Sequence, residues 1–173
     1  MRCRTLAREL KRRGAEVIFL CRRQSGDLID LLAQEFEVFS LPELPLTDCE
    51  GLEGRDLYEA WLGCSQAQDA ADCLQVLRSA HNCNPDWLVV DHYGLDASWE
   101  RQILEGQVGK AQPKLFVIDD LADRPHLSDL LLDQNFFGEA TEHRYEGLLP
   151  PHCRQLLGPH YALLGPEYFQ FHP

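Results

Sequence analysis

The sequence predicts an α/β fold built on a parallel sheet, and three observations support this. Short, unbroken apolar runs recur along the chain, which is typical of parallel strands buried on both faces. Segments with helical periodicity alternate with these runs. The 173 residues are enough for one domain with its own core. Together they predict a Rossmann-like parallel sheet with helices on both faces.

The chain opens with a predicted helix, not a strand. Apolar residues with the spacing of an amphipathic helix fall at Cys3, Leu6, Ala7 and Leu10. Gly14 ends that helix, and the apolar run 17–21 predicts a strand. A helix in a wound sheet normally returns from one parallel strand to the next. We therefore expect the first strand of the fold to be missing, and Met1 to be an internal methionine of a longer protein.

The same alternation continues along the chain. Further strands are expected at 38–41, 87–90, 115–118, 130–132 and 156–157. Further helices are expected at 28–32, 67–77 and 97–104. Ser65 and Gln68 fit a capping box before the second of these helices. The acidic stretch 42–62 is expected to be a long loop with a short helix near 58–62.

Both ends of the chain are interpreted as cut. Residues 1–164 are predicted to form a truncated N-terminal Rossmann-like domain. Residues 165–173, in which aromatic residues lie beside prolines, are predicted to begin a linker into more protein.

The charge is unevenly distributed. The net charge of −12 argues against a nucleic acid or an acidic membrane as partner. Residues 1–23 nevertheless carry eight basic groups against two acidic ones. A solvated helix face and a phosphate-binding patch both explain this excess, and the helix face is the commoner cause.

The seven cysteines are scattered and contain no C-x-x-C pair, which excludes an obvious zinc or thioredoxin-like motif. Reduced thiols predict a cytoplasmic protein. No apolar run approaches membrane-spanning length, and no apolar segment of a signal peptide follows the basic start.

Polar residues follow three of the predicted strands, where ligands bind in open α/β sheets. The residues concerned are Asp91, His92 and Tyr93, then Asp119 and Asp120, then Asp133, Gln134 and Asn135. Each has a structural alternative. The aspartates are equally suited to capping helices or fixing loops, His92 to a structural hydrogen bond, and Tyr93 to packing. His126 is expected at the surface.

Several familiar motifs are missing. The sequence has no G-x-G-x-x-G, no G-x-x-x-x-G-K-[ST] and no G-x-S-x-G, which disfavours a dinucleotide oxidoreductase, a P-loop enzyme and a serine hydrolase. The spacing of the acidic residues matches no metal motif. We expect neither a cofactor nor a metal.

Several long stretches, in order, resemble the UDP-2,4-diacetamido-2,4,6-trideoxy-β-L-altropyranose hydrolases of pseudaminic acid biosynthesis. They are residues 1–7, 61–66, 86–96, 117–124, 129–135 and 157–164. The resemblance implies half of a GT-B-type fold, in which two Rossmann-like domains face each other across a cleft. It also implies release of UDP and the free sugar, with inversion at the anomeric carbon.

The resemblance also assigns residues. It implies Tyr93 and His92 as catalytic-site residues, with Asp91, Asp120 and Asn135 as substrate-binding candidates. The family's presumed base, a histidine of a glycine-rich turn, is expected just before Met1, and the nucleotide-binding domain after Pro173. The fragment is therefore expected to be inactive alone. A GT-B glycosyltransferase using a UDP-sugar and a non-catalytic binding module remain as alternatives.

Overall fold

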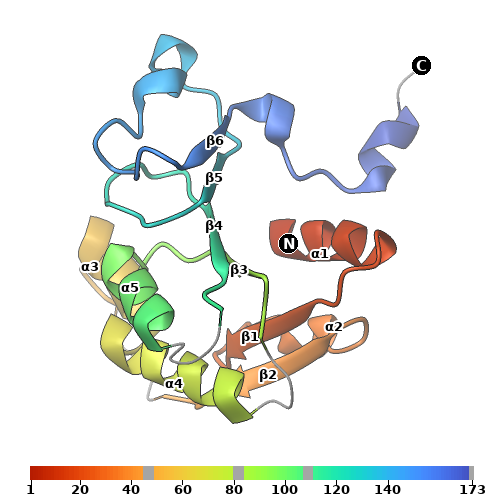
Figure 1. The fold of residues 1–173 in the computed structure, drawn as a ribbon, viewed down its shortest axis with the longest axis vertical. Coiled ribbons are helices and arrows are strands. Elements are labelled where there is room, and N and C mark those ends of the chain that lie inside the picture. The colour runs from red at the N-terminus through yellow and green to blue at the C-terminus, as the bar shows by residue number, and fades with distance from the viewer. Residues whose placement is uncertain (45–48, 80–83, 107–110, 172–173) are drawn as a thin grey trace.

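The computed structural model describes residues 1–44, 49–79, 84–106 and 111–171. Its strands and helices alternate along most of the chain (Figure 1). The strands are β1 (Ile18–Arg22), β2 (Glu37–Leu41), β3 (Trp87–Val90), β4 (Lys114–Ile118), β5 (Leu130–Asp133) and β6 (Arg154–Leu157). The α-helices are α1 (Arg2–Arg12), α2 (Ile29–Leu32), α3 (Gly54–Leu62), α4 (Gln66–Ser79) and α5 (Ala97–Gly106). Three 3-10 helices follow, η1 (Gly138–His143), η2 (Pro159–Tyr161) and η3 (Pro166–Phe171).

All strand pairs are parallel, which confirms the predicted fold class. The strands form two sheets, β1–β2 and β3–β4–β5–β6, where the sequence predicted one. Within the described residues no pairing joins β1 to β3.

One hydrophobic core lies against both sheets on the face that carries α4 and α5. The four-stranded sheet contributes Val90, Val117, Leu131 and Leu88 to it, and the two-stranded sheet contributes Leu41 and Leu20. From the helices come Ala70, Leu74 and Ile103. Because these side chains share one cluster, the two sheets present the same face to the same helices.

The opposite face is covered by α1, which contacts both sheets. Ala7 packs with Phe19 and Val38 of the two-stranded sheet. Cys3 and Leu6 pack against a second cluster formed by Phe116, Ile118 and Leu132 of the four-stranded sheet. The apolar side of α1 that was predicted from the sequence therefore packs against both sheets. Helices lie on both faces of the sheets, as expected.

Ion pairs account for the basic character of α1. Arg4 and Arg8 both contact the carboxylate of Glu35, just after α2. Arg12 and Arg13 contact Glu9 on the exposed side of the same helix. Arg12 and Arg13 are 71% and 70% exposed, as the solvated-face interpretation expects, whereas the Arg4 side chain is only 16% exposed beside Glu35.

Several local expectations are refined by the structure. The helix expected near 58–62 begins at Gly54 and ends at Leu62, and the following Gly63 has a φ of 77°, which glycine readily adopts. Ser65 Oγ accepts the N–H of Gln68, but the Gln68 side chain contacts Asp72 instead of completing the capping box. None of the described helices is long and apolar enough to cross a membrane.

The tail and the cysteines are described in part. Residues 166–171 form η3, and the assignment of 165–173 to a linker stays a prediction, with 172–173 outside the described residues. The thiols of Cys3, Cys21, Cys64, Cys73 and Cys153 are free, and Cys83 lies outside the described residues.

The expectation of a surface position for His126 is wrong. Its side chain is buried, and its Nδ1 lies 2.7 Å from the Glu100 carboxylate, which is itself fully buried on α5. The same carboxylate accepts the N–H of Leu127. The partner residue is 26 positions away in sequence, so local polarity around His126 does not reveal it.

Replacing Glu100 by alanine tests this buried pair. The Glu100→Ala variant should lose roughly 3–5 kcal/mol of unfolding free energy, because His126 and the Leu127 N–H are left buried without this acceptor. Urea unfolding measures the change. Glu105→Ala, at an exposed position of the same helix, is the control and should stay within about 0.5 kcal/mol. Equal stabilities of the two variants would contradict a structural role for the pair.

Candidate functional site

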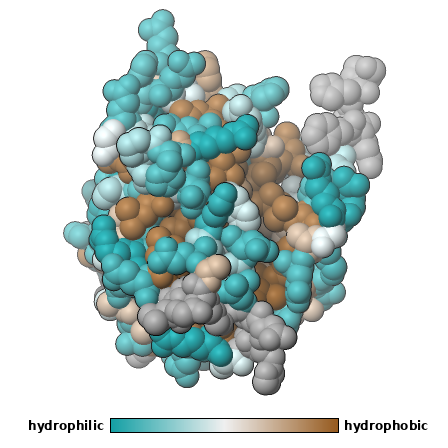
Figure 2. All heavy atoms as spheres, in the orientation of Figure 1, coloured by the Kyte–Doolittle hydropathy of each residue, from teal (hydrophilic) through white to brown (hydrophobic). Residues whose placement is uncertain are grey.

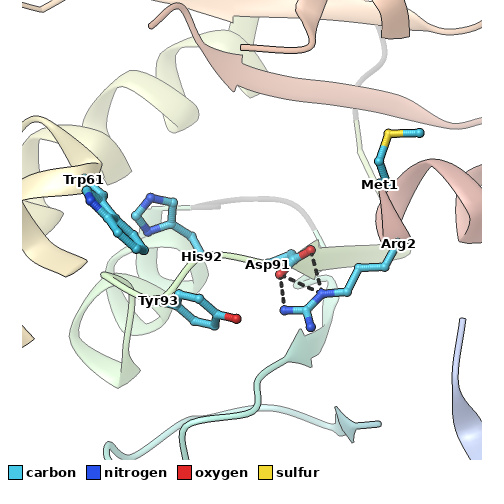
Figure 3. A pocket seen from close by; sticks show the side chains of 6 residues that line it. All are labelled: Met1, Arg2, Trp61, Asp91, His92 and Tyr93. Atoms are coloured by element: carbon cyan, nitrogen blue, oxygen red, sulfur yellow. Dashed lines mark hydrogen bonds and ion pairs between the residues drawn. The ribbon is translucent and has the colours of Figure 1, made fainter. Parts of the chain in front are cut away.

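A cavity of about 430 Å³ opens at the carboxyl end of β3 (Figure 3). Its volume lies in the range of small-molecule sites. The lining residues come from three elements, namely the start of α1, the end of α3 and the loop after β3. They are Met1, Arg2, Trp61, Asp91, His92 and Tyr93. The cavity thus lies where ligands of parallel α/β sheets are normally bound.

Arg2 connects the ends of two neighbouring strands. Its Nη2 and Nε donate to Asp91, just after β3, at 2.7–3.2 Å, as Figure 3 shows. Its Nη1 lies 3.2 Å from Oδ2 of Asp120, just beyond β4. Burial opposes the charged guanidinium, but Asp91 and Asp120 outweigh it and raise the pKa of Arg2. Arg2 and Asp91 therefore line one side of the cavity, and Asp120 binds the same guanidinium.

Asp120 also positions Tyr93. The Tyr93 hydroxyl donates to Asp120 Oδ2 at 3.1 Å, and Arg55 of α3 donates to the Tyr93 carbonyl oxygen at 3.0 Å. Burial and then the Asp120 carboxylate raise the pKa of Tyr93, so the phenol stays protonated at neutral pH. The cavity thereby has a neutral hydroxyl next to carboxylate acceptors.

Aromatic rings form the opposite wall. The ring centroid of Tyr58 is 5.2 Å from those of both Trp61 and Tyr93. Trp61 and Tyr93 line the cavity, and Trp61 is 44% exposed. An aromatic wall facing carboxylates suits an amphipathic ligand that has both an apolar face and hydrogen-bonding groups.

His92 is held by its own loop. Its Nδ1 accepts the N–H of Gly94 at 2.9 Å. Burial lowers the pKa of His92, with partial opposition from the charges of Asp69 and Asp91. Gly94 also lies tightly against α3, since a Cβ there would be 2.5 Å from the Tyr58 carbonyl oxygen. The His92–Gly94 turn therefore fixes the approach of the loop to the aromatic wall.

A buried network supports the loops behind the cavity. Asp119 is fully buried, 2.8 Å from Arg124, and it accepts the Ala122 N–H and the Tyr145 hydroxyl. Burial would raise the pKa of Asp119, but these partners lower it. Asp133 is likewise bound, to Arg144 at 2.9 Å. For both aspartates the loop-fixing alternative is confirmed.

The structure brings four of the five predicted site residues together. Asp91, His92 and Tyr93 line the cavity, and Asp120 contacts two of the side chains that line it. Asn135 is exposed beyond β5 and is not one of the lining residues. No group of three or more His, Cys, Asp or Glu side chains suited to a metal ion occurs in the part of the chain that the structure describes.

Sequence reasoning missed the role of Arg2 and of the aromatic wall. Arg2 was counted with the basic residues of the first helix, and only its alignment with Asp91 in space distinguishes it from them. Trp61 belongs to the resembling stretch 61–66, but sequence reasoning assigned it no role. The spacing of Tyr58 and Trp61 at i and i+3 on a helix is the one local signal that places the two rings together.

The comparisons with known proteins give one informative match. The chain is 38% identical over 84 residues to the UDP-2,4-diacetamido-2,4,6-trideoxy-beta-L-altropyranose hydrolase of Campylobacter jejuni. The resemblance inferred from the sequence is confirmed. The match covers 48% of this chain and 28% of that enzyme, so the matched residues span less than a third of that enzyme's length. No family model and no solved structure matches.

The environment of His92 predicts a pH effect on stability. The folded state lowers the pKa of His92 below its usual 6.5, so the unfolded state binds a proton more readily. His92 therefore contributes stability that is present above that pH and is lost as the pH falls through the folded pKa. His92→Asn keeps an acceptor for the Gly94 N–H but cannot be protonated.

Urea unfolding at about pH 7.5 and about pH 5.5 measures this effect. On going to the lower pH, the wild type should lose more stability than His92→Asn. The other histidines titrate in both proteins, so only the difference is informative. Identical losses would show that His92 is not held as a neutral imidazole.

Proposed function

We propose that this chain is the N-terminal part of a UDP-sugar hydrolase. The reaction would release UDP and a free diacetamido-trideoxy sugar from the nucleotide sugar, with inversion at the anomeric carbon, in pseudaminic acid biosynthesis. The observation that carries this proposal is the 38% identity to an enzyme with that name. The cavity at the carboxyl end of β3 supplies a site for it.

The chemistry demands little of the protein at the leaving group. The second ionisation of the terminal phosphate of UDP has a pKa of about 6, like that of phosphate monoesters. UDP is therefore a good leaving group and needs no strong general acid. The site must align a water molecule, deprotonate it and exclude bulk solvent. An inverting displacement also needs room for that water between the base and the sugar.

The cavity residues suit the sugar part of such a substrate. Asp91 and Asp120 accept hydrogen bonds from hydroxyl or acetamido N–H groups, and the Tyr93 phenol can donate one. Trp61 and Tyr93 offer apolar surface to methyl groups and ring carbons. In this proposal Tyr93 contacts the sugar, His92 positions the loop that carries Tyr93, and Asn135 contacts the substrate from the neighbouring strand end.

The remaining groups come from outside residues 1–173. We propose that the catalytic base is a histidine in a glycine-rich turn before Met1. We further propose that residues 165–173 lead into a nucleotide-binding domain that completes a GT-B-type cleft over residues 1–164. We also propose a cytoplasmic location, which the thiols of Cys3, Cys21, Cys64, Cys73 and Cys153 fit, and action without cofactor or metal.

The test uses these residues in a protein joined to both missing parts. Tyr93→Phe and His92→Ala should each lower kcat/KM for UDP release at least about tenfold, because each removes an oriented contact at the cavity. Tyr161→Phe, an exposed tyrosine of η2, is the matched control and should leave the rate unchanged. Wild-type rates in both cavity variants would remove these residues from the site.

The products separate hydrolysis from transfer. Free sugar formed in step with UDP supports the hydrolase. A product that appears only when an acceptor is added would assign a glycosyltransferase instead, and no turnover of any UDP-sugar would leave a binding module.

A further inference from the structure

The Tyr93 hydroxyl has a single proton, and the structure shows which group receives it. Tyr93 donates to Oδ2 of Asp120 at 3.1 Å. A carboxylate that also faces the Arg2 guanidinium, at 3.2 Å, can only accept hydrogen bonds. While this bond is kept, the Tyr93 oxygen meets a ligand only as an acceptor. To donate to a ligand, the phenol would have to give up Asp120.

Asp120 is itself held in position. Its Oδ2 receives both Tyr93 and Arg2, and the other side of the Arg2 guanidinium is fixed by Asp91 at 2.7 Å. The carboxylate that takes the phenolic proton is therefore anchored from the ends of β3 and α1 together, and it has little freedom to turn away.

These contacts lie beside apolar surface. Figure 2 shows hydrophobic side chains between the four-stranded sheet and α1, which are the two elements that Arg2 joins. Cys3, next to Arg2 in sequence, packs against that sheet. Water competes less for hydrogen bonds in such surroundings, so the bond from Tyr93 to Asp120 is stronger than one at an open surface.

The donors of Arg2 are directed at carboxylates in the same way. Each of its three guanidinium nitrogens donates to Asp91 or Asp120. The Asp91 carboxylate lines the cavity and remains 25% exposed. Asp91 and the Tyr93 oxygen therefore both offer acceptors to a ligand in the cavity.

We propose that Asp120 is a positioning residue that sets the hydrogen-bond polarity of the cavity. It takes the phenolic proton, so that Tyr93 binds a ligand by accepting a hydrogen bond. The ligand group beside Tyr93 then carries an N–H or O–H, such as the N–H of an acetamido group, and a group with acceptors alone is disfavoured. This inference rests on the proposed function only in taking the cavity as the ligand site.

Titration of Tyr93 tests the contact with Asp120. In the chain isotope-labelled at the tyrosine Cζ carbon, the Tyr93 signal is identified by its loss in Tyr93→Phe. Burial and then Asp120 raise the pKa of Tyr93, whereas Arg2 lowers it. Asp120→Asn should therefore lower this pKa. Asp30→Asn makes the same change at an exposed site of α2 and should leave it unchanged.

Arg2→Met gives the same test with the opposite sign, should Asp120→Asn lose the dispersed tyrosine signals of a folded chain. Removing the guanidinium should raise the pKa of Tyr93, because the cation no longer opposes the Asp120 carboxylate.

Two small amides test the polarity directly. N-methylacetamide has one N–H, whereas N,N-dimethylacetamide has the same carbonyl acceptor and no donor. At neutral pH, N-methylacetamide should shift the Tyr93 signal with at least about threefold higher affinity, the contribution of one hydrogen bond. In Asp120→Asn this preference should disappear, because the new amide can donate to the phenolic oxygen and leave its proton for the ligand.

An unchanged pKa of Tyr93 in Asp120→Asn, or in Arg2→Met where that variant is needed, would overturn the proposal. So would binding of N,N-dimethylacetamide as tight as that of N-methylacetamide. Neither measurement involves UDP release. Failure of the hydrolase proposal would therefore appear in the kinetics alone, and failure of the Asp120 proposal in these two measurements alone.

Discussion

The ion pair of Arg2 with Asp91 and Asp120 is the contact on which the arrangement of the site depends. It attaches the first residue of α1 to the ends of β3 and β4, at distances of 2.7 and 3.2 Å. The side chains of Arg2 and Asp120 are 18% and 17% exposed, so solvent screens this contact less than a surface pair. Since α1 packs on both sheets, the pair also sets how the two-stranded sheet lies relative to the cavity.

The aspartates that follow the strands divide into two groups with different tasks. Asp119 and Asp133 are buried and bound by Arg124, Arg144 and the Tyr145 hydroxyl, so they hold loops. Asp91 and Asp120 stay partly exposed; Asp91 lines the cavity, and Asp120 contacts Arg2 and Tyr93, which line it.

The sequence predicted the order and direction of the elements well, because those depend on local patterns. The apolar runs that became β3, β4 and β5 needed no information from elsewhere in the chain. The cluster of Asp91, His92 and Tyr93 followed from the rule that ligands bind at the carboxyl ends of strands.

Long-range partners could not be predicted in the same way. Arg2 meets Asp91 across 89 positions, and His126 meets Glu100 across 26. In each case the residue looked like an ordinary surface charge, and only the fold gives it a specific partner. The split of the strands into two sheets was likewise not predicted.

A double-mutant cycle between Arg2 and Asp91 tests most directly whether this ion pair holds α1 to the sheet. The variants Arg2→Met, Asp91→Asn and their combination are compared by urea unfolding. We expect a coupling free energy of about 1–2 kcal/mol, larger than that of an exposed helix pair such as Arg12 with Glu9. A coupling no larger than that of the exposed pair would contradict the account.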